Sequence, residues 1–305
     1  MTKVKIFRFK VVLFGATSSP FLLNQTIKHH LESQTDSLSP SLMDCFYIDN
    51  FQRCQERVED IVKERPLVES VMLKGNMPLA KWNTNAPLNS TYLPKGDHDY
   101  LGLVWNTERD DFSVKMSVDI KTAIGSVEQY STKRKVVSLF STLYDPIGLL
   151  APISLHGKLF IQSLWMIDKK WDTPLTEEQQ LNLSKAVKKY KGLEQIKVPR
   201  NIFRPGQNQL HVFTDASKRA YGVAAYVVTP DGSSNLLTSR SRFAPKKMLE
   251  EDTHLTTPKL ELTALLLGCR LIRHLQEVQP HLYTELFVWT DATVSLQWVT
   301  NRNGH

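Results

Sequence analysis

Three acidic residues in the last third of the chain stand where they could share metal ions. Asp215 and Asp291 each end a short apolar, β-rich run, and Glu261 lies in the expected first turn of a helix opened by Pro258. This order of strand, helix and strand can gather the three charges at one end of a sheet. Such a cluster is costly unless cations neutralise it, and divalent metals acting on a phosphodiester are the usual use.

Each of these acidic residues also has an ordinary explanation. A single Asp or Glu is by default a solvated or capping residue, and Glu261 alone could complement the helix dipole beside Pro258. Their joint occurrence in the right element order favours the metal cluster.

The hydrophobic pattern predicts the elements that must position these carboxylates. The C-terminal elements are expected as strands at 210–215, 221–228 and 234–240, a helix at 258–277, a strand at 285–290 and a helix from 292. The order β-β-β-α-β-α predicts a mixed sheet with a helix crossing one face, and therefore an α/β fold class.

Upstream of residue 208 the pattern alternates between strands and helices. Strands are expected at 4–13, 45–49 (buried), 100–105 and 112–116, and helices at 20–34, 52–76, 132–168 (interrupted at 145–148) and 175–193. Trp165 and Trp171 are expected to be core anchors. The stretch 190–208, rich in Lys, Arg, Pro and Gly, is the best linker candidate.

The net charge and the cysteines limit which partners and which cellular compartment can be expected. The formal net charge is +7 over 305 residues, which weakly favours a polyanionic partner. Cys45, Cys54 and Cys269 form no C-x-x-C pair and leave an odd thiol, as is typical of a reducing cytoplasmic or nuclear compartment. No apolar run reaches 18 residues and the N-terminus lacks a signal-peptide core, so no membrane partner is expected.

Three motifs around the carboxylates resemble the ribonuclease H domain of retroelement polyproteins. They are Phe-Thr-Asp-Ala-Ser-Lys-Arg-Ala-Tyr-Gly (213–222), Pro-Lys-Leu-Glu-Leu-Thr-Ala-Leu (258–265) and Trp-Thr-Asp-Ala-Thr (289–293). The resemblance implies that Asp215, Glu261 and Asp291 are catalytic, bind two Mg²⁺ ions (or Mn²⁺), and cut the RNA strand of an RNA–DNA hybrid. The family's fourth carboxylate belongs to a later helix, beyond the sequence at hand.

Upstream motifs are similar to reverse transcriptases, and their order resembles the Pao/BEL class of long-terminal-repeat retrotransposons. These motifs lie at 14–24, 46–50, 81–85, 101–105 and 143–152. The first of them implies that Phe14 and Gly15 contact nucleic acid. In the second, Phe-Tyr-Ile-Asp-Asn, the resemblance implies that Asp49 is a polymerase metal ligand with Asn50 in the neighbouring ligand position.

Departures from the family pattern predict that this chain is inactive as a polymerase. The partner Asp of Asp49 would lie on a strand before the sequence at hand, and Asn50 is a weaker ligand than Asp. The ordinary explanation for Asp49 is a β-turn residue. The ligand sets of both sites are thus expected to be incomplete, which leaves enzyme activity open.

The middle of the chain resembles a primer-gripping hairpin around Trp105 followed by a helical thumb. Lys133, Arg134 and Lys135 open the helical stretch and could contact phosphates, although a solvated charge run explains them as well. The expected domains are a reverse transcriptase palm (1–127), a thumb-like region with linker (128–207) and a ribonuclease H-like domain (208–305).

The function expected from these observations is that of a retrotransposon pol polyprotein fragment. Its partners would be an RNA–DNA hybrid or duplex and the rest of the polyprotein. The alternative is a decayed or domesticated, non-catalytic protein that binds nucleic acid or a partner through the same scaffold. No peptidase Asp-Thr-Gly or Asp-Ser-Gly triplet occurs in the sequence.

Overall fold

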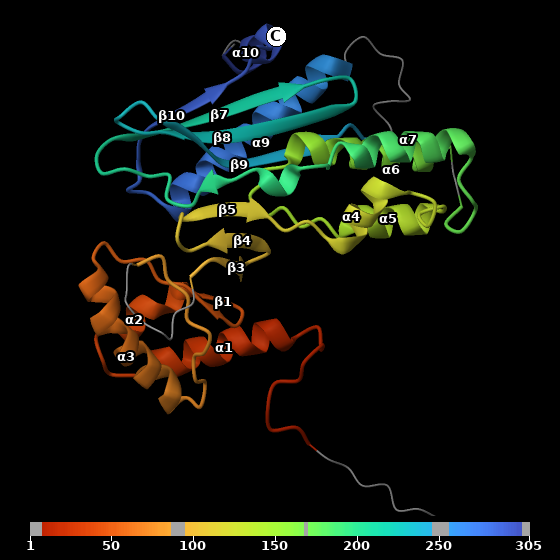
Figure 1. Ribbon diagram of the computed structural model, residues 1–305. Helices are drawn as coiled ribbons and strands as arrows, with labels where there is room; N and C mark the ends of the chain where they lie inside the picture. Colours follow the sequence, from red (N-terminus) through yellow and green to blue (C-terminus); the bar gives the residue numbers. More distant parts are fainter. Residues whose placement is uncertain (1–7, 87–94, 168–169, 246–255, 301–305) are drawn as a thin grey trace, which may run out of the picture. The chain divides into compact units, whose positions relative to one another are not determined.

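The computed structural model describes residues 8–86, 95–167, 170–245 and 256–300 (Figure 1). The chain divides into two units, Met1–Lys95 and Gly96–His305. Helices and strands mix throughout both units, which confirms the expected α/β class.

The N-terminal unit is built on two helices with an apolar core between them. They are α1 (Ser19–Glu32), which has proline in its first turn, and α3 (Val58–Lys74), which continues through Pro66. Between them lie α2 (Ser39–Leu42) and the 3₁₀ turn η1 (Met43–Cys45). The core consists of Ile27, Leu31, Leu42, Val68, Val71 and Met72.

Two expectations for this unit are wrong. The run 45–49 is not a buried strand: β1 (Phe46–Tyr47) pairs with β2 (Asn50–Phe51) in a short hairpin with Ile48 in its loop at φ 56°. Only Phe46 and Phe51 reach the apolar core, so the run lacks the length for a buried strand. Residues 8–13 form no strand, because no described strand forms backbone hydrogen bonds with them. Residues 4–7 of the expected strand lie outside the described residues.

A four-stranded antiparallel sheet opens the C-terminal unit. Its strands, in spatial order, are β3 (Asp97–Tyr100), β4 (Leu103–Asn106), β5 (Asp111–Val114) and β6 (Val198–Pro199). The strand β3 was not anticipated from the sequence. The strand β6 and the 3₁₀ turn η2 (Leu193–Gln195) lie within the expected linker, which is therefore partly structured.

Four helices follow and share one core with this sheet. They are α4 (Val118–Gly125), α5 (Lys133–Ser141), α6 (Ala151–Met166) and α7 (Glu177–Lys188). A Thr176–Gln179 capping box begins α7, where both side chains satisfy backbone groups that the first turn leaves free. The core side chains include Ile120, Val136, Leu139, Leu164, Leu183 and Tyr190.

A second four-stranded sheet forms the rest of the unit. Its strands are β7 (Asn208–Ala216), β8 (Ala220–Val228), β9 (Ser234–Phe243) and β10 (Tyr283–Trp289), in the spatial order β10-β7-β8-β9. The long helix α9 (Thr256–Val278) lies across one face and packs on the strands through an apolar core (Figure 1). The helix α10 (Thr293–Thr300) follows β10.

We found no helix in the described parts of the chain that is both long and apolar enough to cross a membrane.

Candidate metal centre

Asp215 and Asp291 are brought together by the parallel pairing of β7 and β10. In that pairing Val212 lies opposite Val288, and Phe213 lies opposite Trp289. Each Asp follows two residues after this last pair, so the two carboxylates reach the same edge of the sheet. The Thr214 hydroxyl donates to the Trp289 carbonyl oxygen at 2.9 Å, which ties the end of β10 to β7.

Glu261 reaches this edge from α9, which packs very closely on β7. The helix begins at Thr256, two residues before Pro258, so Glu261 lies in its second turn rather than its first. Seven residues further on, Gly268 lies against β7: a Cβ atom there would come within 2.4 Å of Thr214 Cγ2. Absence of a side chain at Gly268 therefore sets how near Glu261 comes to Asp215.

The three carboxylates form one cluster. Asp215, Glu261 and Asp291 each offer an oxygen, and these oxygens lie within 4.8 Å of one another. The two Asp side chains are exposed and Glu261 is half-buried. Burial raises the pKa of Glu261, and the charges of Asp215 and Asp291 raise it further, against a hydrogen bond from the Ala216 backbone.

A buried carboxylate oxygen of Glu261 that lacks a hydrogen-bond donor indicates that this cluster suits a cation. Glu261 Oε2 is buried and has no hydrogen-bond partner among the described residues. A buried carboxylate oxygen without a donor is costly, and a hard divalent cation bound by oxygen ligands removes that cost. These three residues would hold the metal, and their donor set is the kind that Mg²⁺ or Mn²⁺ takes.

Asp49 lies in a different setting. It occupies the exposed two-residue loop between β1 and β2, where its Oδ1 accepts a long 3.4 Å hydrogen bond from Asn50 Nδ2. Within the described residues it belongs to no group of three His, Cys, Asp or Glu side chains that could hold a metal. The hairpin therefore supplies one carboxylate where the cluster supplies three.

Phe14 and Gly15 lie in the segment that precedes α1. Phe14 is fully exposed, and Gly15 adopts φ +81° in open space, where no heavy atom would meet an added Cβ. The expected turn is thus present. Exposure leaves both residues accessible to a ligand, and their contact with nucleic acid stays a prediction.

The basic run at the start of α5 is not one uniform surface. Lys133 is only 5% exposed, and its Nζ lies 3.8 Å from the Trp165 ring centroid and 5.2 Å from that of Trp171. Arg134 makes a two-pronged ion pair with Asp172 at 2.7 and 2.8 Å, whereas Lys135 is exposed. Only Lys135 presents its charge to solvent in the way that a phosphate contact needs.

The two tryptophans are not core anchors as expected. Trp165 is 39% exposed and Trp171 is 47% exposed, and their rings meet edge to face at 5.5 Å. They hold the Lys133 ammonium between them through cation–π contacts instead. The sequence spacing of these residues does not predict this cation–π arrangement, because Lys133 comes from α5, Trp165 from α6 and Trp171 from the following loop.

Comparison with solved structures shows the fold of a reverse transcriptase. The foamy viral protease–reverse transcriptase in complex with dsDNA is 14% identical, with a TM-score of 0.51 over 90% of this chain and 50% of that chain. A second foamy viral structure, the protease–reverse transcriptase dRH in complex with ds DNA, is 16% identical, with a TM-score of 0.50 over 92% and 44%. The chain thus spans half or less of the length of these structures.

Sequence comparison gives a more specific result. No curated protein matches the chain. A protein-family model described as the Pao retrotransposon-like RNaseH-like domain matches residues 132–292, a range that is more than half of the chain and contains all three clustered carboxylates. The chain therefore belongs to the Pao retrotransposon family, through its RNaseH-like domain.

Proposed function

We propose that this chain is part of a Pao-class pol protein and that its carboxylate cluster performs metal-dependent cleavage of the RNA strand of an RNA–DNA hybrid. The proposal rests on one observation: oxygens of Asp215, Glu261 and Asp291 lie within 4.8 Å of one another, and one Glu261 oxygen is buried without a donor. A structural carboxylate would be expected to have a hydrogen-bond partner, whereas a metal ligand has its partner supplied with the ion.

The three side chains have different parts in this proposal. Asp215 and Asp291 are exposed at the sheet edge, where a phosphodiester can approach, and Glu261 braces the site from α9. When bound, divalent metal would supply charge neutralisation for the phosphate and an activated water. The chain's own role is to hold the ligand oxygens at a fixed spacing through the β7–β10 register and the close α9 packing.

The substrate class follows from charge and from the fold. The formal charge of +7 favours a polyanion, and both similar foamy viral structures are complexes with double-stranded DNA. An RNA–DNA hybrid is the duplex that the proposed chemistry consumes. We further propose that the palm, thumb-like and ribonuclease H-like regions divide at 127 and 207, that the rest of the pol polyprotein is a partner, and that the protein acts in the cytoplasm or nucleus.

Metal titration combined with hybrid cleavage tests this function. The purified chain is titrated with Mg²⁺ and Mn²⁺ in a calorimeter and then incubated with a labelled RNA–DNA hybrid. We expect metal binding and RNA cleavage, both lost in Glu261→Gln. The matched control is Glu194→Gln, because Glu194 is an exposed carboxylate on η2 away from the cluster.

The outcomes separate the alternatives. Metal binding that is equal in the wild type and Glu261→Gln would overturn the metal centre. Metal binding without cleavage would favour a non-catalytic nucleic-acid-binding protein that retains the scaffold.

A further inference from the structure

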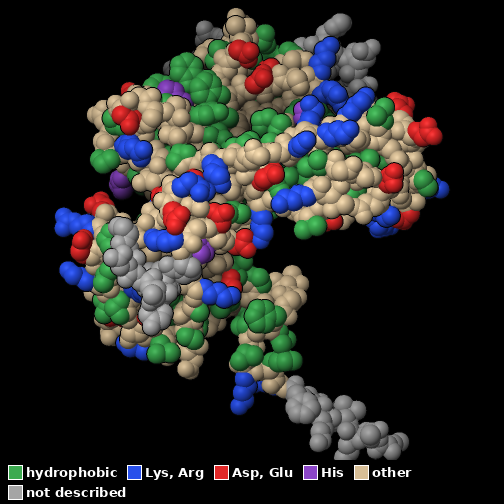
Figure 2. Space-filling view, in the orientation of Figure 1, with side chains coloured by type: hydrophobic (Ala, Val, Ile, Leu, Met, Phe, Trp, Pro, Cys, Tyr) green, Lys and Arg blue, Asp and Glu red, His purple; other side chains and the backbone are tan. Residues whose placement is uncertain are grey.

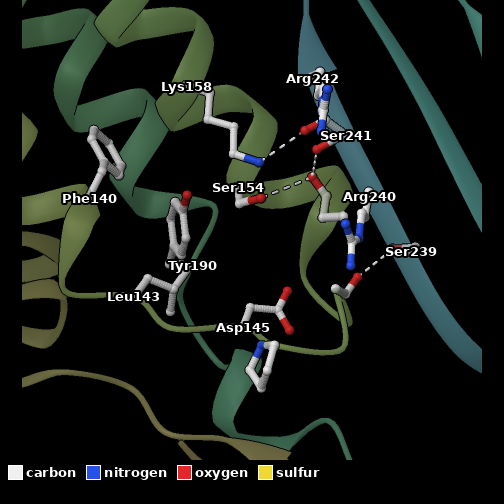
Figure 3. Close-up of a pocket in the computed structure, with 13 residues that line it drawn as sticks. Phe140, Leu143, Asp145, Ser154, Lys158, Tyr190, Ser239, Arg240, Ser241 and Arg242 are labelled. Carbon is white, nitrogen blue, oxygen red and sulfur yellow. Dashed lines mark hydrogen bonds between the residues drawn. The ribbon is translucent and has the colours of Figure 1, made fainter. Parts of the chain in front are cut away.

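A cationic cavity of about 340 Å³ lies in the C-terminal unit where α6 meets the edge strand β9. Lys and Arg side chains gather at this end of the second sheet (Figure 2). Lys158, Tyr190 and Asp145 line the cavity on the helical side, and Arg240 and Arg242 line it on β9 (Figure 3).

The walls of the cavity are fixed by contacts between β9 and the loop that leads into α6. The Ser239 backbone N–H donates to Ile147 O at 2.9 Å, and the Ser241 hydroxyl donates to Ala151 O at 2.9 Å. At Gly148 a Cβ atom would lie 1.8 Å from Ser239 O, so the loop and the strand touch with no room for a side chain. A cavity with such walls is preformed.

Asp145, the one acidic residue among the described residues that line the cavity, already has backbone partners. Asp145 accepts N–H groups from Leu149 at 2.9 Å and from Leu150 at 2.7 Å, at the start of α6. Its carboxylate therefore serves to fix the turn. Burial nevertheless raises its pKa, against these backbone hydrogen bonds.

The basic groups are less completely matched. Lys158 Nζ donates to Ser241 O at 3.1 Å, and burial lowers its pKa, assisted by the charge of Arg242 and opposed by that of Asp145. Arg240 and Arg242 are exposed, and among the described residues neither forms an ion pair with a carboxylate. Their forked donors are free to take an oxyanion.

Further positive charge lies near His156 on α6, the helix that contributes one wall of the cavity. Burial lowers the pKa of His156 on α6, and the charges of Lys189 and Arg219 lower it further. These two cations come from the end of α7 and from the turn between β7 and β8. An excess of positive over negative charge around a preformed cavity attracts anions.

We propose that this cavity binds a phosphate group through Lys158, Arg240 and Arg242, and that the phosphate belongs to the backbone of a nucleic acid lying across the sheet edge. Two guanidinium groups and an ammonium suit phosphate. The inference rests on the proposed nucleic-acid function and names a second anchoring point for the same duplex.

The strand register relates this anchor to the carboxylate cluster. Asp215 pairs with Gly222, and Gly222 pairs with Ser241, which stands between the two arginines. Two strand spacings separate Asp215 from Ser241, roughly 10 Å. That span corresponds to about three nucleotides of rise along one nucleic-acid strand. The β9 backbone beside the arginines thus lies within reach of a strand bound at the carboxylates.

The test compares binding of a fluorescently labelled RNA–DNA hybrid in metal-free, EDTA-containing buffer. The double variant Arg240→Gln/Arg242→Gln is measured against Lys121→Gln/Lys185→Gln, which removes two exposed charges from α4 and α7. We expect the arginine variant to lose about 10-fold in affinity and to lower the slope of log K against log salt by about one, with little change in the control. Equal losses in the two double variants would overturn the proposal.

A second arm identifies the source of the phosphate. Inorganic phosphate and a nucleoside monophosphate are titrated into the wild type and the arginine variant by NMR. Millimolar or weaker binding, together with the affinity loss for the hybrid, supports a backbone phosphate. Tight binding of the mononucleotide with unchanged hybrid affinity overturns the backbone assignment in favour of a free nucleotide site.

These measurements stand apart from the cleavage assay. Hybrid binding is measured without metal. A failure of metal binding or cleavage would therefore contradict the proposed activity, but the effect of the arginine substitutions on hybrid affinity could still be measured. Equal melting temperatures for the wild type and both double variants would show that the fold is intact.

Discussion

The two carboxylate motifs of this chain differ in how they are assembled. Asp49 sits in a two-residue loop between strands of two residues each, so its whole environment is local. Asp215, Glu261 and Asp291 come from a strand, a helix and a second strand, and oxygens of all three meet within 4.8 Å.

This difference shows that a sequence motif containing one carboxylate does not by itself form a metal site. A hairpin of six residues can place one acidic group in solvent, but a two-metal centre needs several carboxylates from elements that pack together. The RNaseH-like sheet supplies that packing through the parallel pairing of β7 with β10 and the close approach of α9. Activity should therefore depend on the C-terminal cluster and not on the hairpin.

The sharpest contrast is between Asp215→Asn and Asp49→Asn. We expect Asp215→Asn to lower hybrid cleavage by more than about 100-fold, since even partners outside the ligand sphere are worth 10- to 100-fold. Asp49→Asn should leave cleavage unchanged, and neither the wild type nor this variant should extend a primer. Gel assays with Mg²⁺ and with Mn²⁺ measure both activities. If the wild type extended a primer and Asp49→Asn did not, the hairpin would be an active metal site and the contrast with the cluster would be wrong.

Packing at Gly268 offers the next largest effect. In Gly268→Ala the new Cβ atom would lie only 2.4 Å from Thr214 Cγ2, which is closer than two carbon atoms can approach. We expect a loss of about 1–3 kcal/mol in the free energy of unfolding, because the helix must move away from the strand. The shift should also weaken metal binding, since Glu261 is on the same helix. Chemical denaturation and calorimetry measure the two effects.

The control for this change is Gly125→Ala. Gly125 ends α4, and a Cβ atom added there would meet no heavy atom within 4 Å, so the extra methyl should be close to neutral. A Gly268→Ala protein that is as stable as the control, with unchanged metal affinity, would show that helix packing does not position Glu261.

The hairpin has its own stabilising contacts, and disturbing them should leave the cluster intact. Phe51 lies 5.1 Å from the ring of Phe46 and 5.8 Å from that of Trp82. Phe51→Ala should destabilise the N-terminal unit by about 1–3 kcal/mol, because its half-buried ring leaves a smaller cavity than a core Phe would. Metal affinity at the cluster should not change. A parallel fall in metal affinity would show that the two regions are coupled.

The smallest effect is the pH dependence of the metal-free protein. Burial, then Asp215 and Asp291, raise the folded-state pKa of Glu261 above its ordinary value of 4.5. Between these two values the folded state binds more protons than the unfolded state, so stability should fall as pH rises through this window. The fall should be small, because the cluster is partly solvated. Thermal melts in EDTA should show it in the wild type and not in Glu261→Gln, and saturating Mg²⁺ should remove it.

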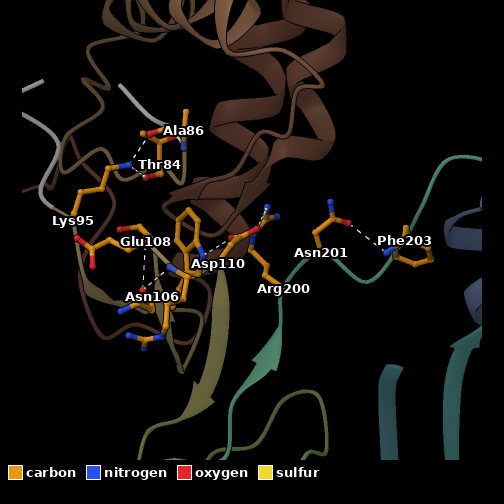
Figure 4. Close-up of polar contacts among 12 residues, drawn as sticks. Thr84, Ala86, Lys95, Asn106, Glu108, Asp110, Arg200, Asn201 and Phe203 are labelled. Atoms are coloured by element: carbon orange, nitrogen blue, oxygen red, sulfur yellow. Dashed lines mark hydrogen bonds and ion pairs between the residues drawn. The ribbon is translucent and has the colours of Figure 1, made fainter. Parts of the chain in front are cut away.

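The stretch 190–208 shows what composition alone conceals. Its Lys, Arg, Pro and Gly content favours a linker, yet Arg200 makes a two-pronged ion pair with Asp110 at 2.6 and 2.9 Å (Figure 4). Trp105 Nε1 donates to the same carboxylate at 3.0 Å, and Val198 pairs with Phe112. The ion pair joins residues 90 positions apart, a separation that a local sequence pattern does not detect.

The sequence by itself determined the identity and order of the RNaseH-like elements. Alternation and helical periodicity depend on neighbouring residues, so β7, β8, β9, α9 and β10 follow from local pattern. It also singled out the three carboxylates, because each has a recognisable place at the end of a strand or near the start of a helix.

Only the tertiary structure decided which charges are available. Lys133 and Lys135 are two residues apart, yet one is buried between tryptophans and the other is exposed. Conversely, Arg240 and Arg242 carry no motif, but the docking of α6 on β9 places them with Lys158 around one cavity. Burial and charge pairing arise from residues distant in sequence, and for that reason the chemistry of a basic side chain is set by the fold.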